Sequence, residues 1–221
     1  MSEPSTSSRQ RDEITPIITY IVTEMTTNAR SLTVERIRDL NDFNYIGCVN
    51  DYTRMPWWRQ LFGLGITPEQ CGNTAISTKT AAFMMWAENV MQGGAWDHKP
   101  YIRSHFNPAA PGGEQVWHRY EDWLYFYDIW SNIHYGFVGA ACGFTESELL
   151  DGAGWEQIGS DLARFSWPNG TPGVEGMRRF DDPSDRASIA IGMRLYPVAT
   201  TAGVLQAVTT STSVTRRRFS P

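Results

Sequence analysis

The stretch YDIWSNIHYGFVGAACG, residues 127–143, carries no charged side chain after its aspartate. Apolar residues dominate it, and we predict that it belongs to a long helix from Tyr120 to about Cys142, which ends at Gly143. Polar side chains in so apolar a helix must be solvated, hydrogen-bonded internally or turned towards a cleft. This helix is therefore predicted to contribute to the core and to be a candidate for part of a functional site.

The polar residues of this helix lie on two adjoining flanks. Asp128, Asn132 and Tyr135 share one face by helical spacing, whereas His134 lies about a third of a turn away. Two interpretations remain open: a buried hydrogen-bond network that sets the helix register, or one wall of a reactive site. Glycines at 136, 139 and 143 remove side chains from one flank, for which close packing is the commoner cause.

A second polar group, WDHKP, follows a predicted helix that stops at Gly93-Gly94. It places Asp97, His98 and Lys99 on a loop, and loops carry reactive groups more often than regular elements do. The alternative is a solvated turn in which Lys99 sits near the helix C-terminus, where a cation is favoured.

The chain as a whole reads as mainly α, a single compact helical domain of residues 14–197 with long Pro/Gly-rich loops over one cleft. A polar head, residues 1–13, is expected to be disordered, and residues 198–221 form a low-complexity tail whose three arginines indicate a mobile terminus. Further helices are expected at 15–29, 31–43, 77–92, 145–150, 154–165 and 182–196. Irregular segments are expected at 44–73, 101–120 and 166–180.

Composition limits the possible functions. A chain of 221 residues supports one substantial core, and its net charge of −5 repels polyanions, so a nucleic-acid role would need a local basic patch. Three cysteines without a C-x-x-C pair indicate neither a disulfide framework nor a zinc site. No signal peptide or membrane span is visible, so we expect no membrane insertion, and a protein that is cytoplasmic or exported by a non-classical or dedicated route.

Several common catalytic signatures are missing from the sequence. There is no G-x-S-x-G motif, P-loop or dinucleotide fingerprint, and neither H-x-x-x-H nor H-E-x-x-H occurs. We therefore expect no bound metal and no organic cofactor. Weaker candidates are Glu24 and Glu88, which interrupt apolar helix faces, and His105 and His118, which fall on the predicted 101–120 loop without a partner pattern. Asp182 and Asp185 read as helix-capping carboxylates around Pro183.

Four ordered motifs resemble the bacterial polymorphic toxin type 44 domain: GGAWDHKP, YDIWSNIHYGFVGAACGF, LLDGAGWEQ and DDPSDRASIAIGMRLY. The resemblance covers the chain from about Ile17 to Tyr196. It implies a toxin or effector domain, with a cognate immunity protein as a partner. Matched residue by residue, it singles out Asp97, His98, Lys99, Asp128, Asn132, His134 and Tyr135.

Three functions follow as hypotheses. The first is a toxin-like hydrolase that acts on a polymer by general acid–base catalysis, leaning towards a cell-wall glycan such as peptidoglycan. In it Asp97, His98, Lys99, Asp128 and His134 are catalytic, while Trp96, Trp130, Asn132 and Tyr135 bind substrate. The second is a metal-independent RNase toxin, against which the acidic charge argues because phosphate binding needs Lys or Arg. The third is a non-enzymatic binding module.

The sharpest expectation is that WDHKP and the 127–143 helix form two halves of one site. His134 and Asp97 should then matter more than His105 or His118, because a helix and a stiffened loop hold them. We expect Asp97→Asn and His134→Ala to abolish activity while thermal unfolding changes little.

Overall fold

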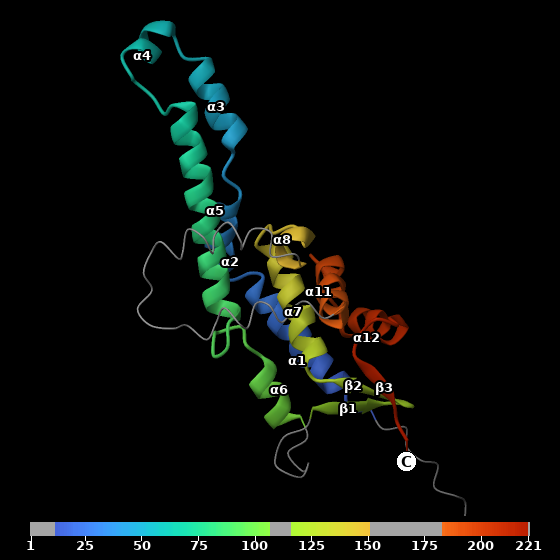
Figure 1. Cartoon of the computed structure of the whole chain (residues 1–221). Coiled ribbons are helices and arrows are strands. Elements are labelled where there is room, and N and C mark those ends of the chain that lie inside the picture. The colour runs from blue at the N-terminus through green and yellow to red at the C-terminus, as the bar shows by residue number, and fades with distance from the viewer. Residues whose placement is uncertain (1–11, 107–115, 151–182, 221) are drawn as a thin grey trace, which may run out of the picture.

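The structure is a computed structural model that describes residues 12–106, 116–150 and 183–220 (Figure 1). It is mainly helical with one small sheet, as predicted. The elements are α1 Thr15–Asn28, α2 Leu32–Asn41, α3 Tyr45–Thr53, α4 Trp57–Leu61, α5 Pro68–Val90, α6 Lys99–His105, β1 Trp117–Tyr120, β2 Trp123–Phe126, α7 Asp128–Ala141, α8 Glu146–Leu150, α11 Pro183–Leu195, α12 Thr201–Thr210 and β3 Arg216–Arg218.

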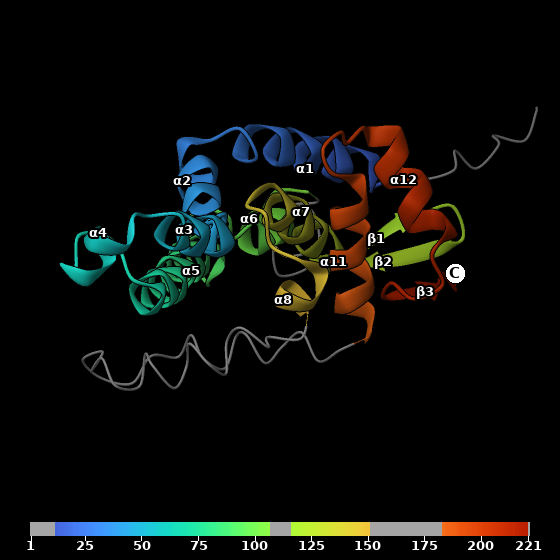
Figure 2. The ribbon, with the colours of Figure 1, turned by 90° about the horizontal axis from the view of Figure 1, so that it is seen from above.

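Helix α7 forms the centre of the fold. Its neighbours α1, α2, α8 and α11 cover it, and nearly all of its side chains are buried (Figure 2). A Cβ atom at Gly136 would lie 2.0 Å from the carbonyl oxygen of Ile189, and one at Gly192 would lie 2.0 Å from that of Ile133. These glycines therefore let α7 and α11 approach backbone to backbone, which confirms packing as the reason for the glycine spacing.

The N-terminal helix α1 covers one side of α7 with an apolar stripe. Ile17, Ile18, Ile21 and Met25 recur at helical spacing and are fully buried. Proline in the first turn suits the helix start, where the Asp12 carboxylate accepts a hydrogen bond from the Thr15 amide at 2.9 Å. Glu13 pairs with Arg119 of β1, so the end of the predicted disordered head is ordered.

Two segments of the chain differ from the prediction because they pair with each other. Residues 117–126 form the antiparallel hairpin β1–β2 instead of the end of the irregular segment 101–120 and the start of the long helix, and β3 adds to its edge. The turn between the strands places Glu121 at a φ of 53°, which a helix does not allow. The predicted mobile tail is wrong as well: it contains α12 and β3, and the Arg216 guanidinium stacks 4.4 Å from the centre of the Trp123 ring.

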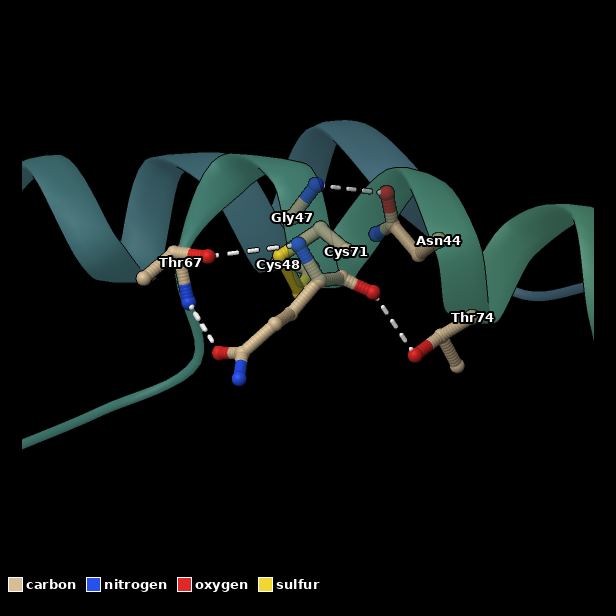
Figure 3. The surroundings of a disulfide bond; sticks show 7 residues. Asn44, Gly47, Cys48, Thr67, Cys71 and Thr74 are labelled. Atoms are coloured by element: carbon tan, nitrogen blue, oxygen red, sulfur yellow. Dashed lines mark hydrogen bonds between the residues drawn. A yellow bond between two sulfur atoms is a disulfide. The ribbon is translucent and has the colours of Figure 1, made fainter.

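Residues 45–71 form an arm that extends away from α7 (Figure 1). The predicted irregular segment here contains α3 and α4, and α5 begins earlier than predicted, at a capping box of Thr67 and Gln70. Cys48 of α3 and Cys71 of α5 form a disulfide (Figure 3), which corrects the expectation that no disulfide was indicated. Their separation of 23 residues carries no local signature, so only the pairing of α3 with α5 reveals it.

Some predicted features lie outside the described residues. They are the helix at 154–165, residues 107–115 of the irregular segment 101–120, the irregular segment 166–180, and Asp182 as a helix cap.

Candidate functional site

The imidazole rings of His98 and His134 meet inside the protein. Their centroids are 4.2 Å apart and the rings are nearly perpendicular. His98 precedes α6 and is 4% exposed, while His134 projects from the middle of α7 and is 1% exposed. The predicted meeting of WDHKP and the 127–143 helix is thereby observed, although a cleft at this point stays a prediction. A groove of about 420 Å³ lies elsewhere, in the arm beside Cys48.

Helix α1 supplies a hydrogen-bond partner to each ring. The Tyr20 hydroxyl lies 2.8 Å from His98 Nδ1, and the Asn28 amide nitrogen lies 2.9 Å from His134 Nε2. Because an amide nitrogen only donates, His134 Nε2 accepts and the ring proton belongs on Nδ1. His98 Nε2 is buried and makes no hydrogen bond within the part of the chain that the structure describes.

Tyr20, Glu24 and Asn28 lie four residues apart, so they form one polar face of α1 that points to the histidines. The Asn28 amide also donates to a Glu24 carboxylate oxygen at 3.5 Å, the long limit of such a bond. Sequence reasoning named only Glu24 here. The repeat at positions 20, 24 and 28 was the signal that could have revealed the other two.

Burial keeps both histidines neutral. Burial lowers the pKa of His98 to about 4, although the nearby Asp97 charge partly opposes this, and it lowers the pKa of His134 well below 6.5 with help from His98. Burial also raises the pKa of Tyr20 to about 12, with smaller contributions from Glu24 and Tyr101. At neutral pH the cluster therefore contains two neutral imidazoles and a protonated phenol. We call Tyr20, Glu24, Asn28, His98 and His134 the histidine cluster.

Asp97 ties the loop that carries His98. One carboxylate oxygen accepts from the Gly93 amide at 3.0 Å, and the other accepts from the Lys99 amide at 3.3 Å. Lys99 is half-buried at the start of α6. The carboxylate thus bridges the end of one helix and the start of the next, which fixes the position of the imidazole between them.

The polar residues predicted to share one face of α7 contact different neighbouring elements. The Asn132 amide donates to Asp185 of α11 at 2.8 Å, and Tyr135 packs edge-on against Trp86 of α5 with ring centroids 4.9 Å apart. Asp128 is half-buried at the start of the helix. His134 contacts His98, whereas Asn132 and Tyr135 contact residues of α11 and α5, because α7 is surrounded and its flanks face different helices.

The family model described as bacterial toxin 44 matches residues 85–198, just over half of the chain. The chain belongs to the bacterial toxin 44 family. Both histidines lie inside the matched residues, whereas α1 and the arm lie before them, so the match begins later than the resemblance from Ile17 predicted. No curated protein and no solved structure matches this toxin 44 chain.

Other residues predicted for the toxin 44 site are placed differently. Trp96 and Trp130 are buried in the core, so neither presents a face on which a substrate could stack. His118 is fully buried in β1 instead of lying on a loop, because alternate strand residues face the core. His105 is exposed and stacks on Tyr101 with ring centroids 4.5 Å apart.

Two further findings concern the described residues of this toxin 44 protein. Within them, no three His, Cys, Asp or Glu side chains gather closely enough to hold a metal ion. None of the helices described is both long and apolar enough to cross a membrane.

Proposed function

We propose that this toxin 44 chain is a hydrolase that acts on a polymer by general acid–base catalysis, and that the polymer is a cell-wall glycan. One observation carries the proposal: two neutral, buried imidazoles touch each other, and one of them has a ring nitrogen without a hydrogen bond in the described structure. Burying such a nitrogen unpaired costs free energy. The nitrogens of His118 are buried in the same way, so the contact between His98 and His134 is what distinguishes this pair as a candidate site.

The hydrogen bonds of His98 suggest which group acts as the general base and which as the general acid. When Nδ1 carries the ring proton and donates to the Tyr20 oxygen, Nε2 holds a lone pair that can accept a proton from water. The Tyr20 hydroxyl is then free to donate its proton to the leaving oxygen. The hydroxide formed adds to the anomeric carbon as the glycosidic C–O bond breaks, and His98 afterwards passes its Nδ1 proton to Tyr20.

Glu24 and Asp97 are the carboxylates that act on this cluster. Glu24 bonds Asn28 and raises the pKa of Tyr20, and Asp97 favours the protonated form of His98. Positive charge develops on the sugar in the transition state of glycoside hydrolysis, and a carboxylate such as Glu24 stabilises it. Tyr20 and Glu24 are half-buried, so they are the members that a substrate would displace or contact first.

Two observations favour a glycan over RNA. The net charge is −5, which opposes binding of a polyanion. The disulfide between Cys48 and Cys71 is typical of proteins that work outside the reducing cytosol, where cell walls lie.

The test compares two polymers with the same purified protein. Isolated peptidoglycan and total RNA are incubated with the wild type, and released fragments are quantified by chromatography. We expect fragments from peptidoglycan only. The rate should be about 100-fold lower for His98→Asn, the size of effect expected for a general base, and it should also fall for His134→Asn, which removes the ring that packs against His98. His105→Asn, which changes an exposed ring, is the matched control and should retain the rate.

The remaining outcomes are decisive against the proposal. Cleavage of RNA alone would establish the RNase hypothesis. Cleavage of neither polymer would favour the hypothesis of a non-enzymatic binding module. If the histidine variants lose activity only in proportion to a fall in melting temperature, the cluster is core structure. Family membership also supports a cognate immunity protein as partner, which we propose would block this cluster.

A further inference from the structure

The end of the arm exposes large apolar side chains that the fold leaves uncovered. The exposed fractions of Trp57, Leu61 and Phe62 are 74%, 71% and 72%, and Trp58, Leu64 and Ile66 are also exposed. They follow one another in the short helix α4 and the turn after it, so they form one patch. We call residues 54–66 the arm tip. A soluble protein rarely exposes so many neighbouring apolar residues without a binding partner.

The charge of the arm tip is opposite to that of the protein. Between Asp51 and Glu69 the sequence contains Arg54 and Arg59 and no acidic residue, although the whole chain has a net charge of −5. Both arginines are exposed, and the Arg59 guanidinium lies 5.6 Å from the Trp58 ring centre. An anionic surface would therefore attract the tip and repel the remainder of the molecule.

The arm holds this patch away from the body. Helix α3 and the start of α5 run side by side, and the Cys48–Cys71 disulfide joins them just below the tip (Figures 1 and 3). A covalent link at this position prevents the two stems from separating. The apolar side chains thus stay at the far end of the arm, where they can meet a flat surface without the body in the way.

We infer that the arm tip attaches the protein to the surface of a lipid bilayer that contains anionic lipids. Tryptophan is favoured at the boundary between headgroups and acyl chains, and arginine binds anionic headgroups there. A short helix with exposed Trp, Leu and Phe enters this interface without crossing the bilayer. The inference modifies the expectation of no membrane insertion, since the tip would enter the interfacial zone alone. It is independent of the proposed hydrolase.

Vesicle flotation tests the inference on the full chain. Vesicles of phosphatidylcholine alone are compared with vesicles that also contain phosphatidylglycerol. We expect the wild type to float with the anionic vesicles and to bind less as salt is raised. The double variant Trp57→Ser/Phe62→Ser should lower binding about tenfold or more, and Arg54→Gln/Arg59→Gln should remove the preference for anionic vesicles.

A matched control replaces equally exposed apolar residues elsewhere. Leu32 and Val198 are 70% and 73% exposed, so Leu32→Ser/Val198→Ser should bind as the wild type does. The His98→Asn variant should also bind normally, which separates this inference from the hydrolase proposal. Circular dichroism checks that every variant is folded.

Three results would overturn the inference. They are a wild type that binds neither vesicle, a tip variant that binds as well as the wild type, and a control variant that loses binding equally. Sedimentation provides the last comparison. The wild type could self-associate without binding lipid while the Trp57→Ser/Phe62→Ser variant stays monomeric. The arm tip would then be an interface between two copies of the chain.

Discussion

His98 has a different environment at each ring nitrogen. Nδ1 is held by Tyr20, while Nε2 makes no hydrogen bond in the described structure, and Asp97 next to it ties the loop at both ends. This arrangement changes the expectation for Asp97→Asn. An amide cannot accept both backbone hydrogen bonds as the carboxylate does, so this variant should lose stability as well as activity. His134→Ala should lose stability too, because it removes a buried ring from the core and leaves the Asn28 amide without its acceptor.

Acid should weaken the fold through its buried histidines. Burial lowers the pKa of His98 and of His118 to about 4, and it lowers the pKa of His134 well below 6.5. Between pH 6.5 and 4 the unfolded chain therefore binds protons that the folded chain does not, so stability is full above pH 6.5 and is lost as the pH falls. For each such histidine, the free energy of unfolding falls by about 1.4 kcal/mol for each pH unit below 6.5 within this window.

Urea unfolding at a series of pH values measures this dependence. His118→Phe should make the free energy of unfolding fall less steeply below pH 6.5, because one buried titrating group is gone. His105→Ala should leave the slope unchanged, since that ring is exposed. A free energy of unfolding that stays constant from pH 6.5 to 4.5 would contradict the burial of these rings.

At the scale of elements, the contact between α7 and α11 decides where the site residues point. Backbones meet at Gly136 and Gly192, which leaves the His134 flank of α7 for α1 and the Asn132 flank for α11. A change in this packing would rotate or shift α7 and separate His134 from both Asn28 and His98. The two glycines therefore help to set the position of His134 through the packing of α7 against α11.

Gly136→Ala should destabilise the protein by about 3 kcal/mol or more, because the added methyl group meets backbone atoms that cannot move aside. Gly72→Ala is the matched control in α5, where an added Cβ would have no neighbour within 4 Å. Alanine favours a helix over glycine, so this control should stabilise by about 1 kcal/mol. Denaturant unfolding of both variants gives the comparison, and equal effects would refute the close approach of α7 and α11.

At the scale of the whole molecule, the arm and the histidine cluster are separate units. The disulfide joins α3 to α5 at one end of α5, while the Trp86 and Trp96 core lies near its other end and leads to His98. The family match covers His98 and His134 but leaves out the arm and the α1 members of the cluster. Hydrolysis and surface attachment are therefore expected to fail independently when either unit is altered.

Reduction of the disulfide should loosen the arm alone. Opening a cross-link that spans 23 residues removes about 3 kcal/mol from the stability of the segment it closes. Limited proteolysis should then cut within residues 45–71 faster in the reduced protein or in Cys48→Ser, while polymer cleavage by the histidine cluster continues. A reduced protein that loses hydrolysis together with its arm would show that the two units are coupled.

The sequence by itself determined the features that depend on near neighbours along the chain. The apolar period of α1, the end of α5 near Gly93 and the apolar α7 follow from spacing and helix-end residues, and the four motifs identified the family. The domain limits 14–197 stay a prediction. The glycines of α7 predicted a close contact with another element, but they did not predict that this element is α11.

Only the tertiary structure decided which distant groups meet. Tyr20 and Asn28 join a site from 78 and 106 residues away, Cys48 finds Cys71, and the C-terminal arginines pair with Trp123 and Trp117 of the hairpin. The strand-paired hairpin, and not a helix, contains residues 120–126, where the long helix was predicted to begin. The physical reason is the same in each case: these hydrogen bonds, cross-links and strand pairs depend on how the packed helices place side chains in space, and no local spacing encodes that placement.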